Sequence, residues 1–274
     1  MPAYRCPVCA SALVADITGF ECANRHRFDR AREGYVNLVP GGRLKGRPAG
    51  DSEAMVRARR TVFDAGLYRP IMDAVASCVA SSVASCVGKS EAPAVLDCGC
   101  GEGSYLAAVS ARCGVDGWGI DVSKPAVKLA ARRHQGLRFA VASSYALPFD
   151  DAGFDAVLSV FSPRPFDEMM RVLVPGGVAV LVTPGADHLH QLKELIYDDP
   201  RSHASPADSP DAAWPLPDTE SEVRFDIQLG DPSLRTTLLE MTPFWWSAPA
   251  ARQELVAHQA HTVTVDMRIA IYRH

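Results

Sequence analysis

The chain has 274 residues, of which 47% are hydrophobic and 22% are charged, and its formal net charge is −4. This length suits one α/β domain with a small additional module, and the composition is that of an ordinary soluble protein. The sequence has no apolar run near the ~18 residues of a membrane span and no signal-peptide core at its start, so we expect a cytoplasmic protein.

Charge and cysteine are distributed unevenly along the chain. Residues 1–69 carry 12 lysines and arginines against 7 acids, whereas the rest of the chain is net acidic. A basic front end favours an anionic partner, but charged runs are also simply solvated surface. The eight cysteines of this core-rich chain indicate metal binding or packing, and they do not indicate a disulfide framework.

The first 90 residues divide into a short module and a helical connection. Residues 1–38 are too few to build their own core, so we expect a metal to hold them together. Residues 39–51 are rich in Gly, Pro and basic residues and predict a linker. Ser52 begins a predicted helix that ends near Ala65, where Gly66 stops it, and a second helix is expected over Arg69–Cys86. Residues 39–90 are therefore assigned as linker and helices.

Residues 91–274 alternate short apolar strands with helices, which predicts a parallel sheet covered on both faces. A predicted helix from Tyr105 and another over Lys124–Arg133 separate the first strands. Residues 198–222 predict an irregular insertion, and two alternating segments after it predict antiparallel strands. We expect a mostly parallel, seven-stranded, Rossmann-like sheet with the strands Ala94–Cys98, Asp116–Asp121, Leu137–Val141, Ala156–Phe161, Gly177–Thr183, Val223–Leu229 and Thr262–Tyr272.

The turn after the first of these strands indicates a cofactor. Residues 97–103 read Asp-Cys-Gly-Cys-Gly-Glu-Gly, so Asp97, Gly99, Gly101 and Glu102 lie at the predicted carboxyl end of a strand. A dinucleotide fingerprint would need glycine at position 104, which is Ser. The pattern resembles the S-adenosylmethionine loop of Rossmann-like methyltransferases. The alternative is a purely structural α/β turn.

Two later segments fit the same cofactor. Asp121 ends the next strand, where a carboxylate can accept both ribose hydroxyls. Residues 141–149 resemble the adenine-binding corner of that superfamily, with Ser143 where an Asp is more common. The Val-Pro-Gly-Gly turn at 174–177 follows in the expected order.

A second constellation predicts a metal site. Cys6, Cys9, Cys22 and His26 have the type, number and spacing of a tetrahedral Cys₃His zinc site, whose four protein ligands make it structural. The alternative is a chance cluster. Four arginines between positions 25 and 32 interleave with Phe28 and Tyr35, which suits RNA binding through phosphates and stacking. These two aromatics are equally well explained as the core of the module.

Together these motifs resemble one family, the bacterial large-subunit ribosomal RNA guanine-N1-methyltransferases. The resemblance rests on the segments 6–9, 25–29, 33–38, 64–68, 101–103, 121–124, 183–189 and 241–244, in unbroken order. It implies zinc on the Cys₃His set, cofactor contacts from Tyr68, Gly101, Glu102 and His188, a ribosomal RNA hairpin as partner, and a homodimer. The roles of Tyr68 and His188 rest on this resemblance alone.

The predicted reaction is attack of guanine N1 on the methyl group of the cofactor. N1 lies on the Watson–Crick edge and carries a proton, so the base must be unpaired and the proton must be accepted. Asp167 and Glu168 are candidate bases, although a solvated helix start explains them better, and Arg164 is a candidate partner for the O6 charge.

Two other functions remain open at this stage. One is methylation of a different RNA or a small molecule, and the other is a catalytically silent protein that binds RNA or a drug. The sequence does not identify the guanine, and it does not distinguish a housekeeping role from macrolide resistance.

Overall fold

The computed structural model describes residues 2–40, 50–84, 92–198 and 215–274. Its two sheets are built from the strands β1 (Leu13–Ala15), β2 (Gly19–Cys22), β3 (Arg27–Asp29), β4 (Val36–Asn37), β5 (Ala94–Cys98), β6 (Asp116–Asp121), β7 (Arg138–Val141), β8 (Phe154–Val160), β9 (Leu173–Pro184), β10 (Thr219–Gln228) and β11 (Thr262–Arg273). The helices are α1 (Glu53–Asp64), α2 (Arg69–Ala84), α3 (Ser104–Cys113), α4 (Lys124–Arg133), α5 (Phe166–Val172), α6 (His190–Ile196), α7 (Pro232–Glu240), α8 (Ala250–Gln259) and the 3₁₀ helix η2 (Pro243–Ser247).

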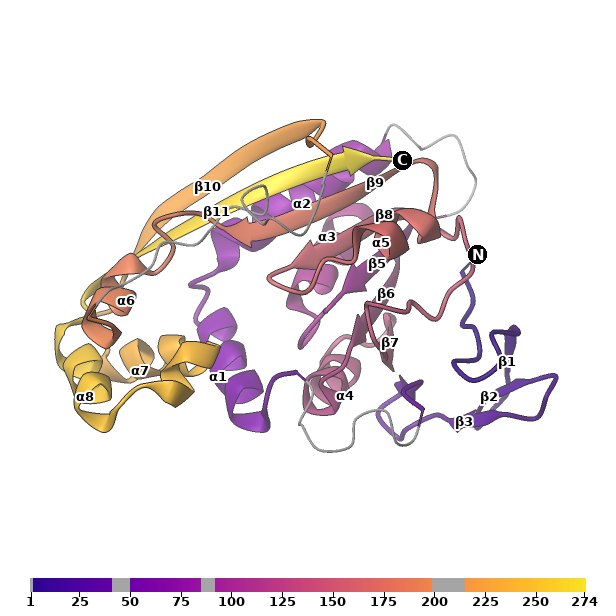
Figure 1. The fold of residues 1–274 in the computed structure, drawn as a ribbon, viewed down its shortest axis with the longest axis horizontal. Helices are drawn as coiled ribbons and strands as arrows, with labels where there is room; N and C mark the ends of the chain where they lie inside the picture. Colours follow the sequence, from indigo (N-terminus) through magenta and orange to yellow (C-terminus); the bar gives the residue numbers. More distant parts are fainter. Residues whose placement is uncertain (1, 41–49, 85–91, 199–214) are drawn as a thin grey trace.

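The main sheet has eight strands in the order β10-β11-β9-β8-β5-β6-β7-β4 (Figure 1). The strands from β9 to β4 are parallel, while β11 and β10 are antiparallel additions at one edge. From β5 the chain builds outward first through β6 and β7, and then in the other direction through β8 and β9. Ligands of such sheets bind outside the carboxyl ends of the strands at this reversal.

The expected Rossmann-like sheet is confirmed, but the expected number of strands is wrong by one. The extra strand is β4, which comes from the N-terminal module and pairs in parallel with β7. Two residues are too few for an alternation pattern, and the pairing partner is distant in the sequence. Only the folded chain therefore identifies this strand.

Most element boundaries agree with the sequence, and the differences bear on the site. Ser52 caps α1 as expected, since its hydroxyl accepts the Met55 N–H at 3.3 Å. Strand β8 ends at Val160, so Phe161 lies in the following turn. Strand β10 begins at Thr219, so the predicted irregular segment is wrong over 219–222. Residues 41–49 of the linker, Cys86 and residues 199–214 of the insertion lie outside the described residues.

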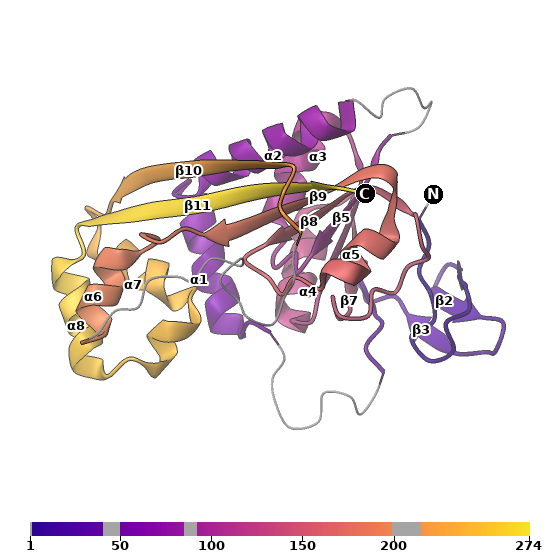
Figure 2. The same cartoon turned by 45° about the horizontal axis from the view of Figure 1, so that its top comes forward.

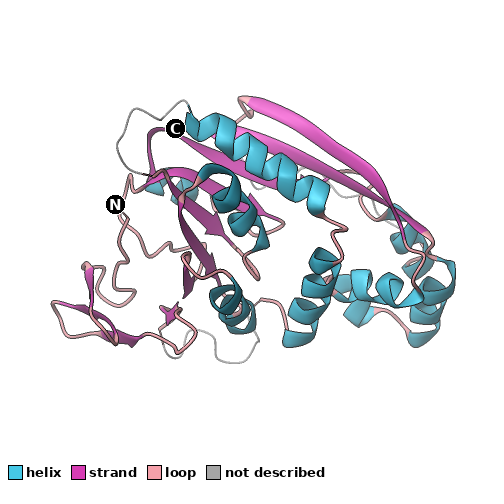
Figure 3. Ribbon diagram, turned by 180° about the vertical axis from the view of Figure 1, so that it is seen from behind, coloured by secondary structure: helices cyan, strands magenta, loops and turns pink. Residues whose placement is uncertain are grey.

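Helices cover both faces of the sheet. Figure 3 shows α2 lying along one face, and α2, α3 and α4 contribute to the larger of two apolar cores. The smaller core lies between the other face, α5 and the N-terminal module. Among the residues that the structure describes, no helix combines the length and apolarity needed to cross a membrane.

The N-terminal module is joined firmly to the larger domain. Tyr4 is buried and its ring contacts Phe20 of the module and Trp118 of β6, with centroid distances of 5.3 and 5.0 Å. The Arg5 N–H also donates to the Pro148 carbonyl at 2.8 Å. At the other end of the molecule, α1 packs on α7, as Figures 1 and 2 show. The division at residues 38 and 90 stays a prediction.

Candidate active site

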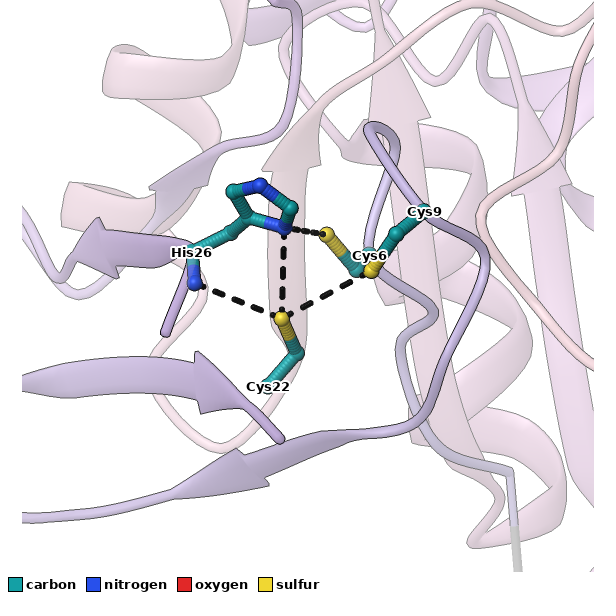
Figure 4. Close-up of side chains that lie close together, drawn as sticks. All are labelled: Cys6, Cys9, Cys22 and His26. Carbon is teal, nitrogen blue, oxygen red and sulfur yellow. Dashed lines mark hydrogen bonds between the residues drawn. The ribbon is translucent and has the colours of Figure 1, made fainter. Parts of the chain in front are cut away.

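The four predicted metal ligands converge in the N-terminal module (Figure 4). Cys6 and Cys9 come from the first loop, Cys22 from the end of β2, and His26 from the turn before β3. Their ligand atoms all lie within 4.8 Å of one another. Residues that are separated in the sequence are thus brought together by the β2–β3 hairpin.

The distances between these atoms fit a zinc ion. A tetrahedral site with Zn–S bonds of 2.3 Å and Zn–N bonds near 2.0 Å has S···S edges of about 3.8 Å and S···N edges of about 3.5 Å. The Cys9 and Cys22 sulfurs are 3.7 Å apart, and His26 Nδ1 lies 3.5 Å from Cys6 Sγ and 3.4 Å from Cys22 Sγ. The residues therefore fit a structural zinc ion with no open coordination position.

The arginines of the module divide into paired and exposed ones. Arg27 forms ion pairs with Asp16 at 2.9 Å and with Glu21 at 3.1 Å, so its charge is largely used within the module. Arg32 is 94% exposed in its side chain and has only a long ion pair with Glu33, at 3.8 Å. Tyr35 is buried in the larger core. Of the two explanations left open for Tyr35, the packing role therefore fits its position.

A cavity of about 450 Å³ lies at the carboxyl ends of β5, β6, β7 and β8. Each strand is followed by a segment that lines it, and α1, the segment after β9 and the segment after α7 complete the walls. The lining consists of Gly50, Asp51, Arg59, Phe63, Tyr68, Gly99–Glu102, Tyr105, Asp121, Val122, Ala142–Tyr145, Val160–Pro163, Pro184, His188, Leu189 and Met241–Phe244. It includes every predicted cofactor residue except Asp97.

Asp97 lies buried beneath this cavity with neither carboxylate oxygen hydrogen-bonded within the described part of the chain. Burial, with a smaller contribution from the nearby Asp121, raises the pKa of Asp97 to about 8. The hydroxyls of Tyr68 and Tyr105 are likewise buried without a described partner, while their rings pack on Phe63. Buried polar groups are nearly always paired, so this cluster indicates a ligand with polar groups of its own.

Asp121 is arranged to bind a diol. Its Oδ2 accepts the Gly101 N–H at 2.9 Å and its Oδ1 accepts the Ser123 N–H at 2.7 Å. Each carboxylate oxygen has a second acceptor position. Two neighbouring hydroxyl groups are the natural partners for that pair of positions.

The glycines of the β5 turn serve different purposes. A Cβ at Gly99 would come within 2.3 Å of Ser162 Cβ, so Gly99 is required by packing against the turn after β8. A Cβ at Gly101 would meet only Arg59 Nη1, at 3.4 Å, while its φ is +56°. Both glycines line the cavity, but a Cβ would have room only at Gly101.

Glu102 is engaged by protein groups. Its Oε2 accepts Arg60 Nη1 at 2.9 Å, and its Oε1 accepts the Ser104 N–H at 3.2 Å. The side chain is almost fully buried, so this pair ties α1 to the loop after β5. The structure thus gives Glu102 a role in fixing the loop, beside the cofactor contact that the resemblance implies.

The turn after β8 projects an aromatic ring into the cavity. Phe161 has φ +53°, a left-handed conformation that is rare for bulky residues. Its N–H donates to Val182 O at 3.1 Å, and Ser162 Oγ donates to Cys98 O at 2.5 Å, which hold the turn in place. The ring is 42% exposed and lies nearly parallel to that of His188, with centroids 6.1 Å apart.

The three candidate catalytic residues are not in the cavity lining. Glu168 accepts Arg171 Nε at 2.7 Å and the Leu147 N–H at 2.7 Å, which lowers its pKa and gives it a structural role. Asp167 is exposed in the first turn of α5. Arg164 is half-buried, and burial lowers its pKa.

Sequence reasoning missed several lining residues. Arg59 and Asp51 form an ion pair beside the cavity, and Tyr105 faces it. The sequence predicts Phe161 as the last residue of a strand, and nothing in the sequence marks the left-handed turn that the structure has there. The sequence predicts the amphipathic helix α1 that carries Arg59. It does not show which face of that helix meets the cavity.

The fold and the two sites together define an S-adenosylmethionine-dependent methyltransferase of class I that carries a zinc ribbon. Two family models match accordingly: residues 4–45 match the N-terminal zinc ribbon of RlmA, and residues 95–177 match a methyltransferase domain.

Curated relatives of this chain identify its family within this class of methyltransferases. A 23S rRNA (guanine-N1)-methyltransferase homologue of Bacillus subtilis, YxjB, is 34% identical over 98% of this chain and 96% of its own length. A homologue of the same name from Micromonospora griseorubida is 36% identical over 100% of this chain and 98% of its own. The 23S rRNA (guanine(748)-N1)-methyltransferase of Streptomyces fradiae is 38% identical over 70% of this chain and 67% of its own. The chain belongs to the family of 23S rRNA (guanine-N1)-methyltransferases.

Proposed function

We propose that this protein transfers a methyl group from S-adenosylmethionine to N1 of a guanine in a hairpin of large-subunit ribosomal RNA. The observation that supports the cofactor is the cluster of buried, unpaired polar atoms on Asp97, Tyr68 and Tyr105 beside the cavity. The substrate is supported by the names of relatives that match this chain from end to end.

The residues present fit the cofactor. Asp97 would receive the α-ammonium group, because a buried carboxylate with no described partner is stabilised by a cation. Asp121 would accept the ribose hydroxyls, and Ser143 lies at the corner for the adenine. Gly101 and His188 line the remaining wall. When bound, the cofactor supplies an electrophilic methyl group on its sulfonium.

The chain's own residues position the acceptor. The Phe161–Pro163 turn lines the cavity on the side of β8, where a flat base can lie against the Phe161 ring. Guanine N1 gains the methyl group and loses its proton, so the base must enter unpaired. Holding the two reactants in the correct orientation can lower the activation barrier by several kcal/mol (~7–11 at best). Asp167 and Glu168 lie outside the lining, which does not support them as the proton acceptor. Arg164 also lies outside it, which does not support Arg164 as the partner of the O6 charge.

The test is methyl transfer to ribosomal RNA. Purified protein with radiolabelled S-adenosylmethionine should label large-subunit ribosomal RNA from cells that lack the gene, and primer extension should stop at one guanine, because N1-methylation blocks pairing. Label on a small molecule or another RNA would contradict the proposed substrate. Cofactor binding without transfer to any RNA would indicate a silent protein.

Two further points are proposals of the same kind. The relative from Streptomyces fradiae is named for guanine 748, and comparison of macrolide susceptibility with and without the gene would distinguish resistance from housekeeping. We propose a cytoplasmic homodimer, supported by the exposed Trp246 and Tyr197 in the C-terminal half. Light scattering of the purified chain measures the assembly.

A further inference from the structure

A second cavity, of about 930 Å³, lies between the zinc ribbon and the methyltransferase domain. The segments 5–10 and 38–40 form one wall, and the loop after β7 with α5 forms the other. Four residues line both this cavity and the cofactor cavity, namely Val122, Ala142, Ser143 and Tyr145. The two cavities are therefore neighbours separated by one loop.

Tyr145 stands on that loop with its side chain largely in solvent. The residue is 68% exposed, among the most exposed large side chains described. The backbone around it is fixed: the Tyr145 N–H donates to Ser143 Oγ at 3.2 Å, and Arg171 Nη2 donates to Leu147 O at 3.2 Å. A firmly held loop that presents an aromatic ring to solvent is suited to stack a flat ligand.

The charges of the second cavity favour a base over a phosphate. Its arginines are both paired, Arg5 with Asp150 at 3.2 Å and Arg171 with Glu168 at 2.7 Å. Val8 of the zinc ribbon lines the same cavity and is 57% exposed. The walls thus offer an aromatic ring and apolar surface, with cations whose charge is already compensated.

We propose that this cavity binds an unpaired nucleotide adjacent to the methylated guanine, with its base stacked on Tyr145. The proposal rests on the proposed function, because the target base must occupy the neighbouring cavity. An RNA strand that leaves the cofactor cavity on the side of β7 passes Tyr145 first, since that residue lines both cavities. The zinc ribbon then has a specific task, which is to form the far wall of a nucleotide site.

The test compares RNA binding with cofactor binding. Affinity for an unstructured 12-nucleotide RNA is measured by fluorescence anisotropy in the presence of S-adenosylhomocysteine, whose own affinity is measured by calorimetry. Tyr145→Ala should weaken RNA binding roughly 5- to 150-fold, the range of one lost base–aromatic stack. Tyr145→Phe should retain RNA binding. Ala146→Trp, at an exposed lining position, should weaken RNA binding by filling the cavity.

Ile17→Ala is the matched control, because Ile17 is 98% exposed on the same module but does not line the cavity. It should leave RNA affinity unchanged, and Ala146→Trp and Ile17→Ala, which do not line the cofactor cavity, should bind S-adenosylhomocysteine like the wild type. Tyr145→Ala should lose much less affinity for S-adenosylhomocysteine than for RNA. Unchanged RNA affinity in Tyr145→Ala, or an equal loss of affinity for S-adenosylhomocysteine, would overturn the proposal. Failure of the wild type to methylate ribosomal RNA while Tyr145→Ala still weakens RNA binding would refute only the proposed function.

Discussion

The zinc cluster and the cofactor cavity are both built from polar side chains, but their polar atoms are satisfied in opposite ways. In the cluster, the four ligand atoms lie within 4.8 Å of one another, where one ion can be coordinated by all of them. Around the cavity, Asp97, Tyr68 and Tyr105 keep buried polar atoms without described partners, and the surrounding sheet holds them there. The small ribbon depends on its ligand for structure, whereas the large domain can hold its site open.

The difference follows from core size. The ribbon's own strands are two to four residues long, and its apolar side chains are completed by those of the larger domain. The methyltransferase domain has a core of its own that tolerates a few unpaired groups. Loss of zinc should therefore cost structure, and loss of a cofactor contact should cost mainly affinity.

The largest effect is expected for Cys22→Ser. A structural zinc ion contributes about 10–16 kcal/mol in isolated zinc fingers, so loss of one thiolate should reduce zinc content from one per chain to near zero. Because Tyr4 links the ribbon to Trp118, tryptophan fluorescence should change with the zinc content measured by mass spectrometry.

Cys78→Ser provides the control, since Cys78 is a free, half-buried cysteine of α2 outside the cluster. It should retain full zinc content and the wild-type fluorescence. A Cys22→Ser protein that still holds one equivalent of zinc would refute the Cys₃His site.

The next effect is expected for Asp97→Asn. Loss of a buried charge partner costs about 2–5 kcal/mol, so affinity for S-adenosylmethionine should fall roughly 30-fold or more by calorimetry. The ligand-free variant should be more stable than the wild type at pH 8. A carboxyl whose pKa is raised on folding is stabilising while protonated, and the wild type loses that stability as the pH rises from about 4 to 8. The gain in melting temperature should be about 2–4 °C per kcal/mol.

Because the pKa of Asp97 is raised, we expect cofactor binding by the wild type to depend on pH. Below its pKa of about 8, Asp97 must lose a proton to bind the ammonium group, so affinity should rise with pH up to about tenfold per unit between pH 6 and 7.5. The rise should level near pH 8, where the cofactor's own α-amino group begins to lose its proton. The slope should vanish in Asp97→Asn and persist in Asp73→Asn, an exposed carboxylate of α2. A flat profile in the wild type would remove Asp97 from the site.

The smallest change in stability is expected for Phe161→Gly. Glycine relieves the left-handed backbone, worth about 1–2 kcal/mol, which offsets the lost contacts of the partly exposed ring. The free energy of unfolding should stay within about 1 kcal/mol of the wild type. Methyl transfer should fall about tenfold or more, because the base loses its stacking surface.

Ala152→Gly is the control for Phe161→Gly. Ala152 has the same φ of +53°, and it lies at an exposed turn outside the cavity lining. It should be at least as stable as the wild type and fully active. If Phe161→Gly lost stability and activity in parallel, the turn would be structural and the ring would have no place in the acceptor site.

The sequence by itself determined the local features of this protein. The zinc ligands are recognisable because Cys6, Cys9, Cys22 and His26 have a spacing that a hairpin can close around one ion. The strand before Gly99 is recognisable because buried parallel strands are near-continuous apolar runs. In both cases one short stretch of the chain carries the whole signal.

Tertiary structure alone decided the features that join distant segments. Strand β4 extends the sheet only because its two residues meet β7, and the turn that begins at Phe161 packs through Ser162 on Gly99. Glu102 meets Arg60, and Tyr145 lies between two cavities, through contacts between segments far apart in the chain. Such contacts depend on how helices and turns pack on the finished sheet, and no local pattern of residue types encodes that packing.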